Sequence, residues 1–369
     1  MTPQGQDAPY RRLVGVGGIG TGLFFALEGG HDLGREESRP ARLLDVRDYC
    51  KLHIVAHYPA VLLRARPSGS AFHVVPVGCV GHDAAGRRLR QEMAAAGMDT
   101  HFVRVVPDRP TLLSVCFQYP DGTGGNITTS NSAASALGAA DVDAVGRLLD
   151  RRTIALALPE APLQERHRLL RLAGATRALR VSSLASAEIG AARERGYFAD
   201  VDLLALNAHE AAALAGAPLT PEVSQAFLDG VCAAADALAP AMRLVVTAGR
   251  RGAFAFDGSR WAHVPALPVS VASSAGAGDA LLGGVLVGLV AGLPLVAPGA
   301  PAALAERPLT SALDLGVLVA AYKLASPHTI PPDLTPDALV TFAGAHAVEL
   351  APELQGLFAS PNSQTPHGR

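Results

Sequence analysis

Short apolar runs alternate with amphipathic segments over most of the chain. Residues 72–79 have the pattern of a buried strand, and Asp83 then caps a helix that carries Leu89 and Met93 on one face and ends at Gly97. Repeated units of this kind predict a mostly parallel sheet covered by helices on both faces, with ligands at the carboxyl ends of its strands. The same patterns predict strands at 13–16, 153–158, 201–206 and 244–247, a strand and a helix within 179–195, and helices at 142–149, 163–172, 313–324 and 337–343, besides a long helix that ends near Leu238.

Two pairs of short strands interrupt this alternation. Residues 111–119 and 127–128 flank a turn at Asp121-Gly122, and residues 253–256 and 261–264 flank a turn at Asp257-Gly258. The first pair predicts a small sheet set apart from the α/β core.

Composition narrows the class of protein. With 369 residues, 49% of them hydrophobic, the chain suits one large α/β domain or two medium ones. A net charge of -2 and an aromatic content of 5% argue against a nucleic-acid partner. The four cysteines lie far apart in the sequence, which favours a reducing cytoplasm over a disulfide framework or a zinc site.

Residues 280–305 contain no charged side chain and are long enough to span a bilayer. Glycines and prolines interrupt this stretch, and Pro294 should end a helix that begins near Gly278. We therefore expect a buried helix followed by a loop, and no membrane partner. The amino terminus has no secretory signal pattern, and the polar residues 360–369 predict a disordered tail.

Residues 273–284 are mostly small and contain one carboxylate, that of Asp279, at the predicted start of this apolar helix. Gly276 and Gly278 allow the backbone N–H groups to converge, and the helix N-terminus attracts an anion. Asp279 would then act as a base that takes a proton from a hydroxyl during phosphoryl transfer. The alternative is a common glycine-rich turn capped by an aspartate.

Three other features each allow two interpretations. Gly15, Gly17 and Gly20 match the G-x-G-x-x-G pattern of a nicotinamide-dependent oxidoreductase, but no helix pattern or suitable acidic residue follows. Asn207 and Glu210 either face a common pocket or form a capping box. His53 and His57 would share one helical face, where packing is a simpler explanation than a metal site.

Several motifs occur in one order along residues 70–345, and together they resemble the ribokinase-like, or PfkB, carbohydrate kinase family. The resemblance implies a three-layer α/β sandwich formed by one domain over residues 1–369, with a small β lid from segments near 21–45 and 110–130. The motifs are Cys79-Val80-Gly81-His82-Asp83, Gly97-Met98-Asp99, Glu160-Ala161-Pro162, Asn207-Ala208-His209-Glu210, Thr247-Ala248-Gly249-Arg250-Arg251-Gly252 and Gly276-Ala277-Gly278-Asp279.

The resemblance also implies roles for individual residues. Asp279 would be the catalytic base and contact the substrate, and Glu160 would face a sugar-like acceptor. Glu210 would help to hold Mg²⁺ near the phosphates of ATP. The anion hole would come from the backbone of Gly276, Ala277 and Gly278, and the nucleotide would be held by Asn207, Thr247, Gly249 and Gly252.

The chain departs from the family pattern in three places. Ser273-Ser274 replaces an Asp-Thr pair whose carboxylate helps to bind a monovalent cation in some relatives, which argues against activation by potassium. Gly22 lies about where an aspartate would hold sugar hydroxyls. Tyr49-Cys50-Lys51 replaces a Gly-Gly pair beside the sugar, so an ordinary furanose or hexose pose is not expected.

The resulting hypothesis is a cytoplasmic enzyme that transfers the γ-phosphoryl group of ATP to a hydroxyl of a small sugar-like or nucleoside-like metabolite. The resemblance leaves room for a homodimer. Two alternatives stay open, a nucleotide- or metabolite-binding protein that has lost catalysis on the same fold, and the nicotinamide-dependent oxidoreductase.

Overall fold

A nine-stranded, mostly parallel sheet forms the centre of the molecule in a computed structural model that describes residues 8–121, 124–218, 223–297 and 303–359. The seven strands from β11 to β5 pair in parallel, whereas β12 and β13 form an antiparallel extension at one edge. In order across the sheet, the strands are β13 (Trp261–Val264), β12 (Ala253–Phe256), β11 (Arg243–Thr247), β10 (Leu203–Asn207), β9 (Leu179–Ser183), β8 (Thr153–Ala157), β1 (Arg12–Val16), β4 (His73–Gly81) and β5 (Val103–Val106).

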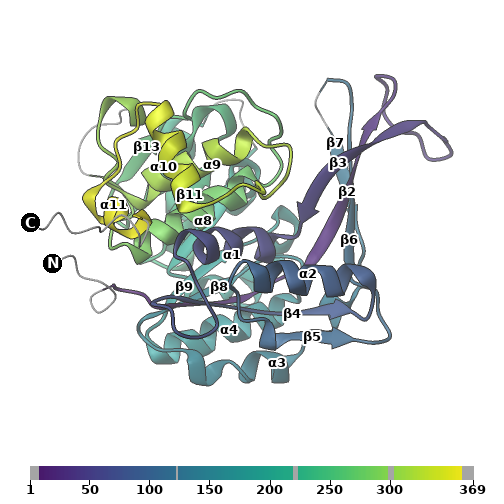
Figure 1. Cartoon of the computed structure of the whole chain (residues 1–369), viewed down its shortest axis with the longest axis horizontal. Coiled ribbons are helices and arrows are strands. Elements are labelled where there is room, and N and C mark those ends of the chain that lie inside the picture. The colour runs from purple at the N-terminus through teal and green to yellow at the C-terminus, as the bar shows by residue number, and fades with distance from the viewer. Residues whose placement is uncertain (1–7, 122–123, 219–222, 298–302, 360–369) are drawn as a thin grey trace, which may run out of the picture.

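Helices cover both faces of this sheet, so the predicted α/β fold is confirmed. In Figure 1, helices α1 and α2 lie on one side of strands β4 and β5, and helices α3 and α4 lie on the other. The helices are α1 (Lys51–Leu62), α2 (Ala84–Ala95), α3 (Ala139–Asp143), α4 (Leu163–Thr176), α5 (Ile189–Glu194), α6 (Ala208–Ala215), α7 (Gln225–Leu238), α8 (Ala277–Val290), α9 (Ala312–Leu324), α10 (Pro336–Ala345) and α11 (Pro352–Phe358).

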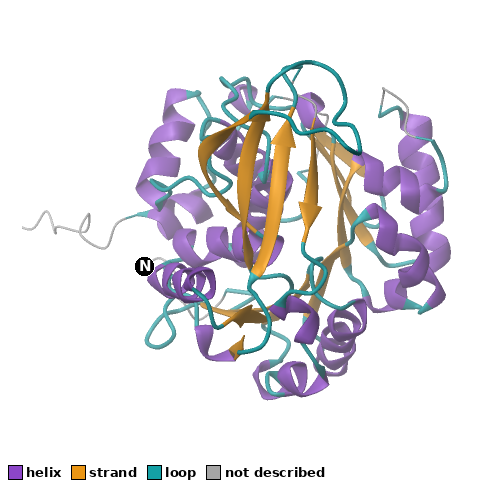
Figure 2. Ribbon diagram, turned by 90° about the vertical axis from the view of Figure 1, so that its right-hand side faces the viewer, coloured by secondary structure: helices purple, strands orange, loops and turns teal. Residues whose placement is uncertain are grey.

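A second, four-stranded sheet projects from one side of the core (Figure 1), and Figure 2 shows the molecule from that side. Its strands pair in the order β3 (Ala41–Tyr49), β2 (Gly20–Leu27), β6 (Leu112–Gln118) and β7 (Gly124–Thr128). Strand β2 is parallel to β6 and antiparallel to β3. Because β2 follows β1 and α1 follows β3, this small sheet is anchored at the edge where the parallel strands end.

Asp83 shows how the sequence ties the two sheets together. Its Oδ1 accepts the Gly86 N–H at 2.8 Å, which caps α2 as the sequence predicted. The other carboxylate oxygen accepts the Thr111 N–H at 2.8 Å, immediately before β6. One side chain therefore fixes both the start of α2 and the entry of a small-sheet strand.

The structure differs from the predicted elements in two main places. The helix expected at 142–149 is instead the short helix α3 followed by a 3-10 turn at Gly146–Leu148. Helix α1 was not predicted from periodicity, because nine of its twelve residues are buried and no polar face marks its turns. The tail at 360–369 lies outside the described residues.

Helix α8 forms the first part of the apolar stretch 280–305 that raised the membrane alternative, and it ends at Val290, before Pro294. All of its residues from Ala280 to Val290 are buried. Side chains at Gly284 and Gly288 would begin 2.9 Å from Gly316 Cα and 2.6 Å from Ala312 Cα of α9, while one at Gly283 would begin 2.8 Å from Tyr58 Cβ of α1. The glycines therefore allow helix backbones to approach closely. Over the described residues, no helix combines the length and the apolar character needed to cross a membrane.

A matched pair of glycine substitutions tests this packing. Gly288→Ala should lower the free energy of unfolding by about 1–3 kcal/mol, because the new methyl group meets the backbone of α9. Gly230→Ala, in the exposed interior of α7 with nothing within 4 Å, should instead raise it by up to about 1 kcal/mol. Urea unfolding followed by circular dichroism compares the two. Equal effects of the same sign would contradict the proposed contact.

Candidate active site

Side chains from four separated segments meet at the carboxyl edge of the parallel sheet. Asn207 and Thr247 end the adjacent strands β10 and β11 and are paired in register. Glu160 follows β8, and Asp279 lies in the first turn of α8. The sequence placed each of these residues at a strand end or helix start, and the fold brings them to one edge.

The turn before Asp279 has the geometry of an anion-binding site. Gly276 adopts a left-handed conformation with φ of 75°, which a residue with a side chain rarely tolerates. Within the described part of the chain, the backbone amides of Gly278 and Asp279 have no acceptor, whereas the Ala277 N–H donates to the Ser274 carbonyl at 3.2 Å. A side chain at Gly278 would begin 3.7 Å from Thr247 Oγ1. An anion at this helix start would therefore contact free amides beside Thr247.

Lys51 is the nearest charged partner of Asp279. Its ammonium lies 3.5 Å from Asp279 Oδ1, and one third of its side chain is exposed. The Asp279 carboxylate beside it raises the pKa of Lys51, with further contributions from Glu210 and Glu160. Lys51 is therefore a cation at neutral pH, surrounded by carboxylates.

Glu160, which contacts the backbone of Lys51, has an uncommon backbone conformation. Its φ is 68°, and its Oε2 accepts the Lys51 N–H at 3.0 Å, at the start of α1. Gly18 must lack a side chain, because a Cβ there would lie 2.3 Å from Glu160 Cβ. Burial raises the pKa of Glu160, while the neighbouring Lys51 opposes the shift.

Asp48 supplies a carboxylate where the sequence suggested that one is missing. A side chain at Gly22 of β2 would begin only 1.8 Å from Asp48 Oδ2, so the Asp48 carboxylate fills the volume beside Gly22. Burial raises the pKa of Asp48 to about 6, and the charges of Glu160 and Asp279 contribute to the increase. The carboxylate therefore comes from β3 instead of from β2.

Asn207 and Glu210 form the capping box that the sequence allowed. Asn207 Oδ1 accepts the Glu210 N–H at 2.9 Å, and Glu210 Oε2 accepts the Asn207 N–H at 2.8 Å. Burial raises the pKa of Glu210, while Lys51 lowers it and Asp279 raises it further. The cap therefore aims a carboxylate toward the same electrostatic cluster.

Glu210 is also a suitable partner for Mg²⁺ that is held mainly by phosphates. Among the described residues, no group of three or more His, Cys, Asp or Glu side chains is arranged to hold a metal without other ligands. Magnesium commonly keeps water ligands and takes one or two carboxylates together with substrate phosphates. The Glu210 carboxylate, which is electrostatically coupled to Asp279 at the start of α8, fits that pattern.

The glycines after Thr247 have different functions. Gly252 has a φ of 89°, and a Cβ there would lie 2.1 Å from the Val264 carbonyl oxygen, so packing of the hairpin explains this glycine. Gly249 has a φ of 56° and nothing within 4 Å of its missing side chain. Its backbone is therefore accessible to a ligand such as a nucleotide.

The remaining candidate motifs, the glycine motif at residues 15–20 and the two histidines of α1, do not form ligand sites in the described structure. The turn after β1 leads into strand β2 and not into a helix, so Gly15, Gly17 and Gly20 do not form the dinucleotide-binding turn that was the alternative for them. His53 and His57 lie in α1 with ring centroids 5.9 Å apart. Burial lowers the pKa of both rings, that of His57 to about 4, so both are neutral packing residues.

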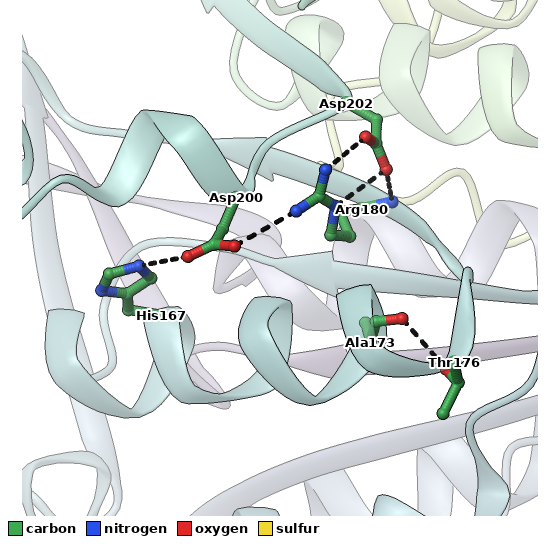
Figure 3. A network of polar contacts seen from close by, with 6 residues as sticks. All are labelled: His167, Ala173, Thr176, Arg180, Asp200 and Asp202. Carbon is green, nitrogen blue, oxygen red and sulfur yellow. Dashed lines mark hydrogen bonds and ion pairs between the residues drawn. The ribbon is translucent and has the colours of Figure 1, made fainter. Parts of the chain in front are cut away.

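A polar network lies at the end of the sheet opposite the candidate active site, beside the amino ends of β9 and β10, and it borders a surface hollow of about 700 Å³. Figure 3 shows Arg180 between Asp200 and Asp202, at 3.2 and 2.7 Å, with His167 bonded to Asp200 at 2.9 Å. Its central guanidinium is paired with two carboxylates. This network therefore stabilises strand ends and is separate from the candidate active site.

Sequence patterns pointed to Asp279, Glu160, Asn207, Glu210 and Thr247, but not to Asp48 and Lys51, which the structure places in electrostatic contact with Asp279 and Glu160. Both missed residues lie at the junction of β3 and α1, close to the sheet edge. Lys51 carried a signal, because it lies in the segment that departs from the Gly-Gly pair of the family pattern and is one of two lysines in the chain.

Comparisons with known proteins agree with this geometry. A model of the pfkB family of carbohydrate kinases matches residues 65–336, whereas a search among curated proteins finds no match. Solved structures with the same fold include the ribokinase from Giardia lamblia, with a TM-score of 0.70 at 14% identity, covering 94% of this chain and 99% of that one. Others are the Arabidopsis thaliana ribokinase complexed with ribose and ATP (TM-score 0.63, 16% identity, 95% and 99% covered) and the Burkholderia thailandensis nucleoside kinase in complex with inosine (0.65, 17%, 90% and 98%).

Asp48 should reveal its elevated pKa through stability. Because its folded-state pKa lies above the value of an exposed aspartate, about 3.9, the unfolded chain loses this proton first as the pH rises. Relative to Asp48→Asn, the wild type should therefore lose about 1–2 kcal/mol between about pH 4 and 6 and no more above pH 6, given solvent screening of a half-buried carboxylate. Denaturant unfolding at each pH measures the difference.

The control for this measurement is Asp45→Asn, on the exposed part of the same strand. It removes an exposed carboxylate from the same strand, and the pH dependence of Asp48→Asn is compared with it. A stability difference for Asp48→Asn that does not change with pH would show that the carboxylate is not held in the cluster.

Proposed function

We propose that this chain, which belongs to the pfkB family of carbohydrate kinases, transfers the γ-phosphoryl group of ATP to a hydroxyl of a small sugar-like or nucleoside-like molecule. The observation that carries the proposal is the position of Asp279. Its carboxylate lies in the first turn of α8, where backbone amides have no acceptor, at the carboxyl edge of the sheet. A base and an anion site are thus adjacent.

In the proposed reaction, the hydroxyl oxygen of the acceptor molecule attacks the γ-phosphorus of ATP. Asp279 takes up the proton that this hydroxyl loses. The bond from that phosphorus to the bridging oxygen breaks, and ADP leaves. The amides of Gly278 and Asp279 would stabilise the charge on the transferring group, in the manner of an oxyanion hole. Mg²⁺, when bound near Glu210, would neutralise phosphate charge.

The acceptor would bind between the small sheet and the start of α1. Asp48 and Glu160 present carboxylates that can accept hydrogen bonds from hydroxyl groups. Both are electrostatically coupled to Asp279, which supports their being in one pocket with the base. Ribose and inosine, the ligands of two structural relatives, are reasonable first acceptors to test.

Asp279→Asn is the direct test of the proposed base. The variant should bind ADP with unchanged affinity, because the amide keeps the shape of the helix start. Its rate of ADP formation should fall by about 10²- to 10⁴-fold, the usual contribution of a general base. A coupled assay with ATP and a panel of pentoses, hexoses and nucleosides gives the rate, and calorimetry gives the affinity. Full activity in the variant would overturn the assignment.

The Lys51–Asp279 ion pair favours a second candidate, a nucleotide- or metabolite-binding protein without catalysis. The Lys51 ammonium, 3.5 Å from Asp279 Oδ1, can compete with the acceptor hydroxyl for that proton-accepting oxygen.

Lys51→Met separates the two functions. If Lys51 orients Asp279 and the acceptor, the variant should lose at least about tenfold in kcat/KM, equivalent to 1.4 kcal/mol. If Lys51 instead blocks the base, the wild type should show no turnover with any acceptor of the panel, and the variant should gain ATP consumption. The same coupled assay distinguishes these results.

A further inference from the structure

Lysine is confined to two positions in this chain. Of its 31 lysine and arginine residues, only Lys51 and Lys323 are lysines. Lys51 contacts Asp279. Lys323 lies in the last turn of α9, has no exposed surface, and has no part in the proposed reaction. A fully buried ammonium requires compensation, because leaving water strongly disfavours a charge.

Two backbone carbonyls supply that compensation. Lys323 Nζ donates to the Ser273 carbonyl oxygen at 2.7 Å and to the Ser326 carbonyl oxygen at 3.4 Å. Within the described residues, no carboxylate lies within ion-pair distance of Lys323, although Asp48 acts on it electrostatically from further away. The carbonyl end of α9 adds the negative end of the helix dipole.

Both carbonyls belong to segments that contact the anion-binding turn. Ser273 lies three residues before Gly276, and the preceding Ala272 N–H donates to the Leu324 carbonyl at 2.8 Å. Ser326 begins the loop that leads to Thr329, and a side chain at Gly276 would begin 3.1 Å from Thr329 Cβ. The Lys323 ammonium therefore joins the two backbone segments on which the turn rests.

The same loop reaches the acceptor side of the site. The Thr329 N–H donates to the Arg47 carbonyl at 3.1 Å, and Thr329 Oγ1 accepts the Tyr49 N–H at 3.2 Å. These contacts place the loop against β3 on both sides of Asp48. The Lys323 ammonium thus contacts the backbone that supports the anion-binding turn. Through the loop to Thr329 it is also connected to β3, the strand that carries Asp48.

We propose that the Lys323 ammonium is a built-in cation that holds residues 273–276 in the conformation needed for phosphoryl transfer, so that no added monovalent ion is required. This inference rests on the proposed function. Lys323 is a positioning residue, because it acts through the backbone of the turn and touches neither nucleotide nor acceptor in the proposed reaction. A tethered ammonium satisfies carbonyl oxygens as a free K⁺ or NH₄⁺ ion would.

The charge state of Lys323 gives the proposal a pH signature. Burial lowers the pKa of Lys323 to about 8, and Asp48 on β3 opposes the shift. Other ionisable groups on the packed segments include His328 in the loop, Arg47 and Tyr49 on β3, and Asp279 on α8. Turnover should fall as the pH rises through about 8.

Unfolding of the protein would not account for this expected fall in turnover above pH 8. The folded-state pKa of Lys323 lies below the value of an exposed lysine, about 10.4. Above pH 8 the unfolded chain therefore binds more protons at this position, and the contribution of Lys323 to stability rises with pH. Falling activity without a falling unfolding temperature is the expected combination.

The first experiment uses the wild-type chain labelled with ¹³C and ¹⁵N in lysine only. Two side-chain signals are expected, assigned with Lys51→Arg and Lys323→Met. The Lys323 signal should titrate near pH 8, and the Lys51 signal should remain in its charged form there. A Lys323 signal that does not change up to pH 10, or that is neutral at pH 7, would contradict the assigned charge state.

The second experiment tests the cation by removal and rescue. Lys323→Met should lower kcat at least tenfold and weaken the binding of ATP, because the disturbed turn also holds phosphate, whereas Leu324→Met, a packing change on the same turn, should do neither. In Lys323→Ala, NH₄Cl should restore part of the lost rate, and choline chloride at equal concentration should not. The wild-type rate should be equal in KCl and choline chloride.

Several results would overturn the proposal. They are a wild-type kcat in Lys323→Met, a tenfold activation of the wild type by K⁺, and rescue by choline as effective as rescue by NH₄⁺. Binding of a non-hydrolysable ATP analogue provides a readout that does not need an acceptor. Weaker binding by a folded Lys323→Met variant supports the cation even if no acceptor is turned over, which would count against the proposed function alone. Unchanged binding together with absent turnover would reject both.

Discussion

Direct contact between the backbone of helix α8 and its neighbours is the constraint on which the rest of the structure depends. Glycines face α1 on one side of the helix and α9 on another, so the axis cannot shift without a collision. A helix fixed in this way has a fixed first turn. Asp279 and the free amides beside it therefore keep one position relative to the strand ends, although the surrounding turn consists of small residues.

Around that fixed point the chain gathers more negative than positive charge. Asp48, Glu160 and Glu210 each have a raised pKa, mainly because burial disfavours their ionised forms. Such an arrangement costs stability and is typical of sites built for chemistry. Lys51 contacts Asp279 and offsets part of the repulsion among the carboxylates. Lys323 provides a second positive charge at the Ser273 carbonyl, just before the turn.

The sequence was sufficient for the class of fold and for the residues that follow strand ends. Periodicity predicts amphipathic elements well, and it failed for α1 because a helix buried on most sides has no polar face to reveal its turns. Motif order led to Asp279 and Glu210. Asp48 could not be recognised in the same way, because its importance arises from the pairing of β3 with β2, and pairing between strands is not written in local spacing.

The exchange between Gly22 and Asp48 has an evolutionary consequence. The two positions share one volume, so a side chain at the first excludes the carboxylate of the second. Each substitution alone either crowds the pocket or empties it, and the two changes together restore it. The positions should therefore be epistatic, with effects that do not add. A comparison that scores each position separately would record a missing ligand at Gly22 and an ordinary acid at Asp48, although this chain has a carboxylate in the volume that the two positions share.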